Sequence, residues 1–243
     1  MIPSRRIVQN LLKKNLSTLG ALDPYQEALL AEKCILVDEN DREVGHASKK
    51  ECHLKTSGNE GRTPLHRAFS LFMFNKNNEL LLQQRSDTKV TFPGLWTNTC
   101  CSHPLFLNDE RETKNGLGAK IAAQRKVWQE IGVPAQACPI DQMQFISRIL
   151  YYADSDDQWA EHELDYILFL KSNQEKIQLE ANPEEVQNVM YLKKSDLTDF
   201  VKDMGPEKLT PWFTLMCNSM LPKWWDSLDD LKPFINHDQI IRY

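Results

Sequence analysis

A helix closed by glycine and proline lies near the middle of this chain, flanked by segments with the composition of β-strands. Residues 117–131 have a helical pattern, and Gly132 and Pro134 are residues that favour the end of a helix. A short helix capped by Ser195 is predicted to run to Val201, and a further helix is predicted to start at Thr210 and Pro211, as N-cap and N1 residues. Strands are predicted at residues 34–38, around residue 44, and at residues 67–74, 79–84, 143–152, 159–169 and 186–192. This mixture of elements predicts an α/β fold.

The length and composition favour one folded domain. With 243 residues, of which 41% are hydrophobic and 26% charged, the chain can bury a sizeable core, and we expect residues 23–243 to form a single domain. A net charge of −5 gives no reason to expect nucleic acid or an anionic membrane as the main partner. No apolar run approaches the roughly 20 residues of a membrane helix, so we expect a soluble monomer without membrane insertion.

Two features bear on the cellular compartment. The six cysteines include no C-x-x-C pair, and a core of this size makes disulfide bonds unnecessary, so we expect free thiols in the cytoplasm. Residues 1–22 contain Arg5, Arg6, Lys13 and Lys14 but no acidic residue. Such a segment resembles a mitochondrial transit peptide, and the alternative is an N-terminal helix or tail.

The stretch Thr99–Pro104 places a thiol two residues before an imidazole. In an extended backbone residues i and i+2 point to the same side, so Cys101 and His103 share a side and Cys100 faces the opposite one. A cysteine and a histidine on one side can form a metal site, a nucleophile with its base, or a proton donor beside a metal. The stretch alone leaves all three possibilities open.

Two further histidines and two glutamates are of the residue types that bind metal ions in proteins. His53, His66 and His103 are either ligands of one metal ion or separate surface and core residues, and their positions near strand and loop boundaries leave both interpretations open. Glu161 and Glu163 alternate along a predicted strand, so both carboxylates lie on one face of it. Paired carboxylates of this kind can bind a divalent cation or act as acid and base.

Arg85 and Lys89 place two positive charges beside a Pro-Gly corner. They follow a predicted hairpin, in which residues 75–78 connect the strands at 67–74 and 79–84. In a helix the two cations would share a face, and in a loop they could still converge. Such a pair suits a phosphate group as ligand, and the alternative, which is commoner for such pairs, is two solvated surface charges.

The end of the predicted central helix resembles the Nudix box, R-E-U-x-E-E-x-G-U with U aliphatic. Residues 125–133 read R-K-V-W-Q-E-I-G-V, so Lys126 and Gln129 replace two of the box glutamates and Glu130 remains. In that superfamily these glutamates bind metals and activate the water for diphosphate hydrolysis. The stretch therefore predicts a related fold from which most of the hydrolytic residues are missing.

Seven motifs in one order make the chain similar to the type I isopentenyl-diphosphate Δ-isomerases of the Nudix superfamily, and to their eukaryotic branch in particular. The similarity covers about residues 30–243. The motifs are Lys49–Leu54 (KKECHL), Leu65–Phe69 (LHRAF), Leu81–Asp87 (LLQQRSD), Thr97–Pro104 (TNTCCSHP), Glu161–Glu163 (EHE), Thr210–Phe213 (TPWF) and Lys223–Trp225 (KWW). The resemblance implies a Nudix-type α/β/α sandwich with a mixed sheet and extra C-terminal helices. It also implies an enzyme that interconverts isopentenyl diphosphate and dimethylallyl diphosphate in isoprenoid biosynthesis.

By this resemblance each site residue has an expected role. Cys101 and Glu163 would transfer protons, with Tyr151 hydrogen-bonded nearby and Trp212 over the hydrocarbon. The diphosphate would be bound by Lys49, Arg85, Lys89 and Ser102, with help from Lys126. One divalent ion, Zn²⁺, Mn²⁺ or Mg²⁺, would be held by His53, His66, His103, Glu161 and Glu163. A Mg²⁺ ion that bridges to the diphosphate would be held by Glu130.

Moving a double bond from a terminal to an internal position requires a proton at one carbon and removal of a proton at another. The carbons are not acidic, so the plausible route passes through a tertiary carbocation, with an acid and a base on opposite faces of a dry pocket. Three departures from the family leave the preferred length of the substrate open: Ala160 before the E-x-E motif, Lys126 in place of an arginine, and the sequence GRTP at residues 61–64, before His66. The competing interpretations are an active Nudix hydrolase and a metal-stabilised binding module.

Overall fold

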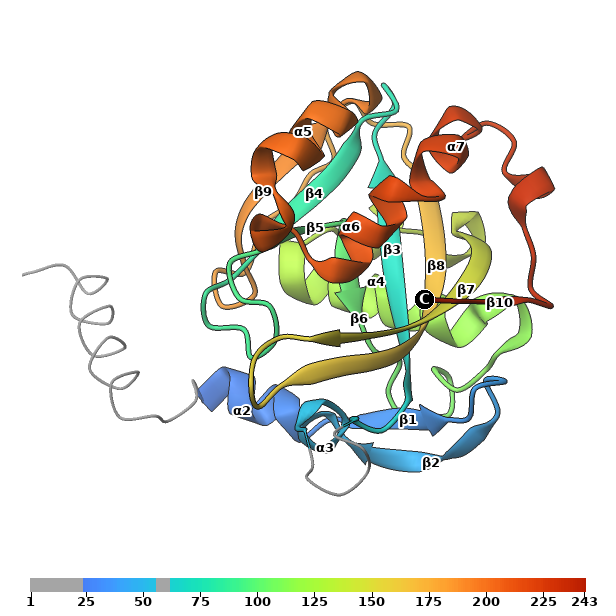
Figure 1. Cartoon of the computed structure of the whole chain (residues 1–243). Helices are drawn as coiled ribbons and strands as arrows, with labels where there is room; N and C mark the ends of the chain where they lie inside the picture. Colours follow the sequence, from blue (N-terminus) through green and yellow to red (C-terminus); the bar gives the residue numbers. More distant parts are fainter. Residues whose placement is uncertain (1–23, 56–61) are drawn as a thin grey trace, which may run out of the picture.

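The computed structural model describes residues 24–55 and 62–243, and its centre is one mixed β-sheet (Figure 1). The segment 1–22, for which a transit peptide or tail is predicted, lies outside the described residues. The strands are β1 (Lys33–Val37), β2 (Glu43–Ser48), β3 (His66–Phe74), β4 (Leu80–Arg85), β5 (Trp96–Thr97), β6 (Cys100–Ser102), β7 (Gln144–Asp154), β8 (Ala160–Lys171), β9 (Val186–Leu192) and β10 (Ile240–Arg242).

The sheet is built around β3. The main path runs β10-β7-β8-β3-β1-β2, β4 and β6 also pair with β3, and β5 and β9 pair with β4. β3 with β8 and β7 with β10 are parallel pairs, and the remaining pairs are antiparallel. All nine residues of β3 are buried, as expected for a strand covered on both faces.

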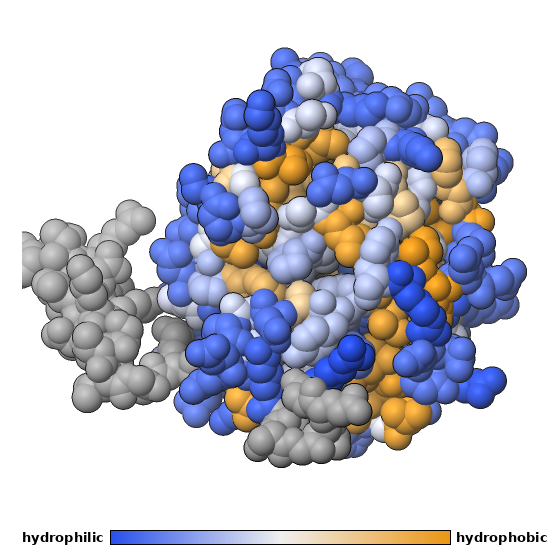
Figure 2. Space-filling model, in the orientation of Figure 1, coloured by the Kyte–Doolittle hydropathy of each residue, from blue (hydrophilic) through white to orange (hydrophobic). Residues whose placement is uncertain are grey.

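Helices cover both faces of the sheet. They are α2 (Pro24–Leu30), α3 (Lys49–His53), α4 (Leu117–Ile131), α5 (Leu197–Met204), α6 (Pro211–Asn218) and α7 (Leu221–Asp226). One hydrophobic core forms between the sheet and α4, and another lies under α5, α6 and α7, over which Figure 2 shows hydrophobic surface. Within the described residues, no helix is long and apolar enough to cross a bilayer. The predicted α/β/α arrangement with C-terminal helices is confirmed (Figure 1).

The central helix has the predicted bounds, because its end is determined locally. Gly132 follows Ile131 with φ of 67°, a left-handed conformation that glycine adopts without strain, and its N–H donates to the carbonyl of Trp128. The helix α6 begins at Pro211, after Thr210, as predicted. The cap predicted at Ser195 is wrong, because Ser195 lies within a short 3-10 turn and Asp196 is the N-cap residue of α5. The helix also extends past the predicted end at Val201, to Met204.

The predicted hairpin of β3 and β4 forms only at its turn. Phe74 pairs with Leu80, and beyond that pair β4 aligns with β9 while β3 aligns with β6 and β8. The side chain of Asn75 holds the turn: its amide donates to Glu79 and to the carbonyl of Glu175, and its oxygen accepts the N–H groups of Asn77 and Glu79. Alternation alone could not show that the two strands diverge.

A buried ionic cluster fixes the turn between β1 and β2 to the strands that carry the site. The carboxylate of Asp41 accepts hydrogen bonds from Arg67 Nε at 2.9 Å, Arg148 Nη1 at 2.8 Å and the Tyr166 hydroxyl. Arg67 directly follows His66, so this cluster also anchors the start of β3. Asp41 has φ of 65°, a conformation that asparagine also tolerates.

Replacement of Asp41 by asparagine is expected to lower the free energy of unfolding by about 3–5 kcal/mol, because it leaves buried guanidinium groups without a counter-ion. Urea denaturation of the full chain measures the effect. The matched control is Glu39→Gln, which removes an exposed carboxylate paired with Arg242 and is expected to cost about 1 kcal/mol or less. Equal losses in the two variants would contradict the role given to Asp41.

Candidate active site

The two adjacent cysteines lie on opposite faces of the sheet. β6 pairs with β3 so that Cys101 lies opposite Ser70. Cys100 is fully buried in the core on the α4 side, with its thiol 3.6 Å from the carboxylate of Glu130. Cys101 packs against the other core, which contains Trp212. The alternation predicted for this stretch therefore separates the two thiols.

The Cys101 thiol has three polar neighbours, of which the Thr97 hydroxyl, at 3.5 Å, is the most distant. The thiol donates a hydrogen bond to Asn98 Oδ1 at 3.0 Å and accepts one from Trp212 Nε1 at 3.1 Å. The same indole N–H lies 3.1 Å from Asn98 Oδ1. Burial raises the pKa of the Cys101 thiol to about 12, so the sulfur keeps its proton at neutral pH. This environment suits a proton donor better than a thiolate nucleophile.

Three histidines converge on one carboxylate oxygen. The Nε2 atoms of His103, His66 and His53 lie 2.7, 3.5 and 3.8 Å from Oε1 of Glu163. The ligand atoms of these four side chains all lie within 4.8 Å of one another, and all four side chains are buried. They come from the end of α3, the start of β3, the residue after β6, and β8, so the fold brings together residues that are distant in the chain.

Backbone carbonyls orient two of these rings. Nδ1 of His53 lies 2.7 Å from the carbonyl oxygen of Lys49, and Nδ1 of His66 lies 2.9 Å from that of Pro64. A carbonyl only accepts, so the neutral rings carry their proton on Nδ1 and direct the Nε2 lone pair toward Glu163. Among the described residues, neither Nε2 has a hydrogen-bond partner. Lone pairs that face a carboxylate need a cation between them, so this donor set fits a divalent metal ion.

Burial and Glu163 act on the histidines in opposite directions. Burial lowers the pKa of His53 to about 4 and lowers the pKa of His103 well below its usual value. At His66 burial is outweighed by the Glu163 carboxylate, which raises the pKa of that ring. Burial likewise opposes ionisation of Glu163, but hydrogen bonds from the histidines hold its pKa well below the usual range. The carboxylate is therefore ionised and has either a proton or a metal ion beside it.

The other carboxylate of the E-x-E motif lies beside this cluster. Glu161 accepts hydrogen bonds from the hydroxyl of Thr91 at 2.9 Å and from the hydroxyl of Tyr151 at 3.1 Å. Tyr151 also donates to Glu163 Oε2 at 2.5 Å, so it links the two carboxylates. Burial, followed by the charge of Glu163, raises the pKa of Glu161 to about 7. His162 faces the other side of β8, where Nδ1 lies 2.8 Å from the carbonyl oxygen of Thr63.

Cys101 and Glu163 line the same cavity. Its other lining residues are Lys49, Arg85, Lys89, Thr91, Ser102, His103, Glu161 and Trp212. A neighbouring cavity shares Lys49, Arg85, Lys89 and Thr91 with it and extends under α2. The thiol and the metal-site carboxylate therefore lie at one end of a cationic depression.

The predicted diphosphate residues divide into two groups. Lys49, Arg85, Lys89 and Ser102 line the cavity. The guanidinium of Arg85 is buried and fixed by the carbonyl oxygens of Thr91, at 2.7 Å, and Phe92, at 3.0 Å. Lys126 is 1% exposed and is not among the residues that line either of these two cavities in the described chain.

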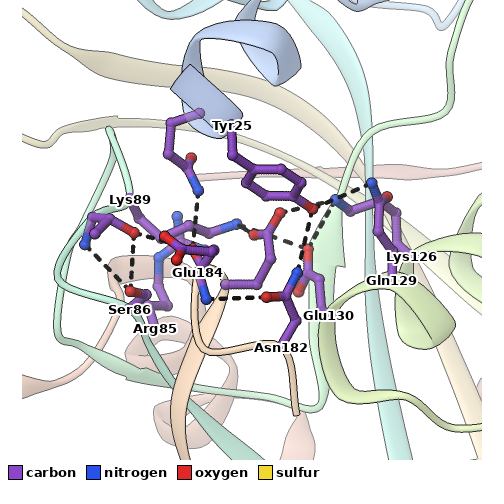
Figure 3. Close-up of polar contacts among 12 residues, drawn as sticks. Tyr25, Arg85, Ser86, Lys89, Lys126, Gln129, Glu130, Asn182 and Glu184 are labelled. Carbon is purple, nitrogen blue, oxygen red and sulfur yellow. Dashed lines mark hydrogen bonds and ion pairs between the residues drawn. The ribbon is translucent and has the colours of Figure 1, made fainter. Parts of the chain in front are cut away.

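Lys126 and Glu130 belong to a buried ionic cluster next to the cavity (Figure 3). Lys126 Nζ lies 3.2 Å from Glu130 Oε1, an i,i+4 pair on α4, and 3.8 Å from Glu185 Oε1. Lys89 forms ion pairs with the same two carboxylates. In Figure 3, Tyr25 of α2 lies over this cluster.

Sequence reasoning missed Glu185 and Asn98. Glu185 follows another glutamate in a polar segment before β9, and only its complete burial distinguishes it. Asn98 lies inside the stretch around Cys101, and a short amide between two threonines in a predicted buried region could have indicated a structural hydrogen bond.

A family model for the NUDIX domain matches residues 64–213. This match and the mixed sheet between helices define the chain as a member of the NUDIX family. Isopentenyl-diphosphate Delta-isomerase 1 of Mus musculus is 48% identical over 223 residues, covering 91% of this chain and 96% of that protein. Isopentenyl-diphosphate Delta-isomerase I of Clarkia breweri is 51% identical over 215 residues, covering 86% and 74% respectively.

Within the NUDIX family, the chain belongs to the isopentenyl-diphosphate Delta-isomerases, as the sequence motifs predict. Among solved structures, a NUDIX hydrolase from Alicyclobacillus acidocaldarius aligns with a TM-score of 0.48 at 10% identity, over 65% of this chain and 91% of that one. The family assignment rests on the domain match and the two isomerases.

Proposed function

We propose that this chain interconverts isopentenyl diphosphate and dimethylallyl diphosphate, a step of isoprenoid biosynthesis. The mouse and plant relatives are named for isopentenyl-diphosphate isomerisation. The observation that carries the proposal is that the Cys101 thiol and the Glu163 carboxylate line one buried cavity. Migration of an unactivated double bond requires an acid and a base on either side of a small, dry pocket.

In the forward direction, Cys101 adds its proton to the terminal alkene carbon, and a tertiary carbocation forms at the neighbouring carbon. Glu163 then removes a proton from the carbon on the other side, and the electrons of that C–H bond form the internal double bond. The sulfur ends as a thiolate and the carboxylate as an acid, so one proton returns to Cys101 before the next turnover. The raised pKa of Cys101 and the lowered pKa of Glu163 support this division of roles.

Two aromatic residues assist these steps in the proposal. Trp212 is 2% exposed, lines the cavity beside Cys101 and offers a ring face to the carbocation. Such a contact is worth about 0.5–2 kcal/mol, more when it is shielded from water. Tyr151 bonds both Glu161 and Glu163, which supports a role in orienting the base.

The diphosphate is proposed to bind at the cationic end of the depression. Lys49, Arg85, Lys89 and Ser102 are the binding residues, and Lys126 supports them from the adjacent ionic cluster. Binding energy from this anchor holds the small hydrocarbon between the acid and the base.

His53, His66, His103 and Glu163 are proposed to hold one divalent ion, Zn²⁺, Mn²⁺ or Mg²⁺, with Glu161 as a further ligand. The close approach of the three Nε2 atoms to Glu163 supports the first four ligands, and the Tyr151 hydroxyl, which bonds both Glu161 and Glu163, supports Glu161 as the fifth. The ion supplies a fixed positive charge that orients Glu163. Glu130 is proposed to bind a Mg²⁺ ion that accompanies the diphosphate.

The test is to incubate the full chain with isopentenyl diphosphate and Mg²⁺ and to follow the alkene protons and the phosphorus signals by NMR. We expect signals of the internal alkene to appear while the diphosphate stays intact. Release of monophosphate or phosphate would instead identify a hydrolase, the activity that the replacement of two box glutamates by Lys126 and Gln129 disfavours.

A further inference from the structure

The ionic cluster next to the cavity forms a closed ring of alternating charges. Lys89 contacts Glu185 and lies 3.9 Å from Glu130, while Lys126 lies 3.2 Å from Glu130 and 3.8 Å from Glu185. Each ammonium therefore contacts both carboxylates. All four residues are buried, with exposed fractions of 8% or less. Two lysines and two glutamates balance in charge, which lets the ring exist in a buried site.

Two carboxylate oxygens of the ring can still accept a hydrogen bond or bind a cation. Among the described residues, Oε1 of Glu130 and Oε1 of Glu185 are buried without a hydrogen-bond partner. Gln83 donates its amide N–H to Glu130 Oε2 at 3.2 Å, and its own Oε1 is likewise buried without a partner in the part of the chain that the structure describes. Oxygen atoms of this kind are the ligands that Mg²⁺ and Mn²⁺ prefer.

The backbone holds the two carboxylates near each other. The N–H of Asn182 donates to the carbonyl oxygen of Glu130 at 2.9 Å, and the N–H of Glu185 donates to the carbonyl oxygen of Asn182 at 2.9 Å. Ser86 N–H donates to the carbonyl oxygen of Glu185 at 2.9 Å. The segment before β9 is thereby attached both to the end of α4 and to the loop that contains Lys89. Glu185 is as firmly positioned as Glu130.

Lys89 is the member of the ring whose side chain can turn away from the two carboxylates and toward the cavity. Its side chain lines both cavities, and the other three members are not among the lining residues of those cavities in the described chain. A diphosphate beside Lys49 and Arg85 would attract the Lys89 ammonium, and the Glu185 and Glu130 carboxylates would then share the single remaining ammonium of Lys126. A divalent cation, with twice the charge of an ammonium, suits that position better than water does.

We propose that Glu185 is a second carboxylate ligand, beside Glu130, of the divalent cation that accompanies the diphosphate. In the chain without ligand, the Lys89 ammonium occupies the place of that cation. This inference rests on the proposed function only in taking a diphosphate as the ligand that draws Lys89 away. It assigns a ligand role to a residue outside the Nudix box.

The test is Mn²⁺ binding in the absence of any substrate, read from the EPR signal of free Mn²⁺. The full chain is first given one equivalent of Zn²⁺, which the three-histidine cluster prefers, so that the Mn²⁺ measured belongs to a second site. We expect weak binding by the wild type. In Lys89→Met the two carboxylates keep Lys126 but lose the second of their two ammonium partners, so we expect Mn²⁺ to bind at least about tenfold more tightly.

The double variants decide the role of Glu185. Lys89→Met combined with Glu185→Gln is expected to lose the gain in Mn²⁺ affinity. Lys89→Met combined with Glu180→Gln, a matched change at an exposed glutamate of the same segment, is expected to keep it. No gain in Lys89→Met, or equal affinities in the two double variants, would overturn the proposal. Isomerisation is not measured in this experiment, so its result is independent of the test of the proposed function.

A second measurement is used if circular dichroism shows that Lys89→Met is not folded. The Mn²⁺ complex of inorganic pyrophosphate is titrated into the Zn²⁺-loaded wild type and into Glu185→Gln. We expect about tenfold weaker binding of the Mn²⁺ complex by the variant, and no loss of affinity for metal-free pyrophosphate. The metal-free arm uses pyrophosphate without added Mn²⁺ and without chelator, so that Zn²⁺ stays in the histidine cluster. An unchanged affinity for the Mn²⁺ complex, together with a loss of affinity for metal-free pyrophosphate, would make Glu185 a positioning residue for the lysines and refute the ligand role.

Discussion

Replacement of Cys101 by alanine is expected to abolish isomerisation, with kcat falling by roughly 10²–10⁴-fold. In the proposed mechanism Cys101 is the acid: its thiol lines the cavity that Glu163 also lines, and burial raises its pKa to about 12. Alanine supplies no proton, and water is a poor substitute in a closed site. The measurement is the rate of double-bond migration by NMR at saturating isopentenyl diphosphate. Circular dichroism of the same sample checks that the fold persists.

The adjacent thiol provides the control. Cys100 is fully buried on the α4 side of the sheet, near Glu130, so Cys100→Ala is expected to keep most of the activity and to lose about 1 kcal/mol of stability. If the loss of activity in Cys101→Ala came from general damage to β6, Cys100→Ala would lose activity as well. Turnover at the wild-type rate in Cys101→Ala would refute the assignment of the acid.

Local patterns predicted the parts of the fold that are determined locally. The bounds of α4 follow from a helical pattern and from Gly132, which ends the helix through its own backbone conformation. The separation of Cys100 from Cys101 follows from the two-residue period of a strand. The β3–β4 hairpin was predicted on the same basis, but only one residue pair forms beyond its turn. Further along the two strands, β3 pairs with β6 and β4 pairs with β5 instead of with each other.

From the sequence, only those site residues that belong to a recognisable motif could be predicted. His53, His66, His103 and Glu163 were expected together from the family resemblance, and the fold does bring them together. Glu185 carries no local signal, because its partner Lys89 lies 96 positions earlier in the chain and nothing in a single sequence couples the two. Its role becomes visible only from burial and from the closed ring of charges.

Removal of the divalent metal from the three-histidine cluster is expected to stop isomerisation and to lower the melting temperature. Without a metal ion, imidazole lone pairs and the Glu163 carboxylate face one another in a buried site. A metal that binds only the folded chain stabilises it by about 2.7 kcal/mol at a free concentration of about a hundred times its Kd. The experiment dialyses the full chain against a chelator and then returns Zn²⁺, Mn²⁺ or Mg²⁺ singly. Scanning calorimetry gives the melting temperature, and NMR gives the rate with Mg²⁺ present in every activity sample.

Two histidine variants locate the ion that produces these changes. In His66→Ala the cluster loses a fully buried ligand, so the melting temperature is expected to respond to added metal much less than in the wild type. The matched control is His46→Ala, which changes an exposed histidine that packs on Phe106 and lies outside the cluster. It is expected to show the same metal-dependent rise in melting temperature as the wild type. If His66→Ala gains as much stability from metal as His46→Ala does, the ion binds elsewhere, and the base in the cavity would have to work without a metal ion to orient it.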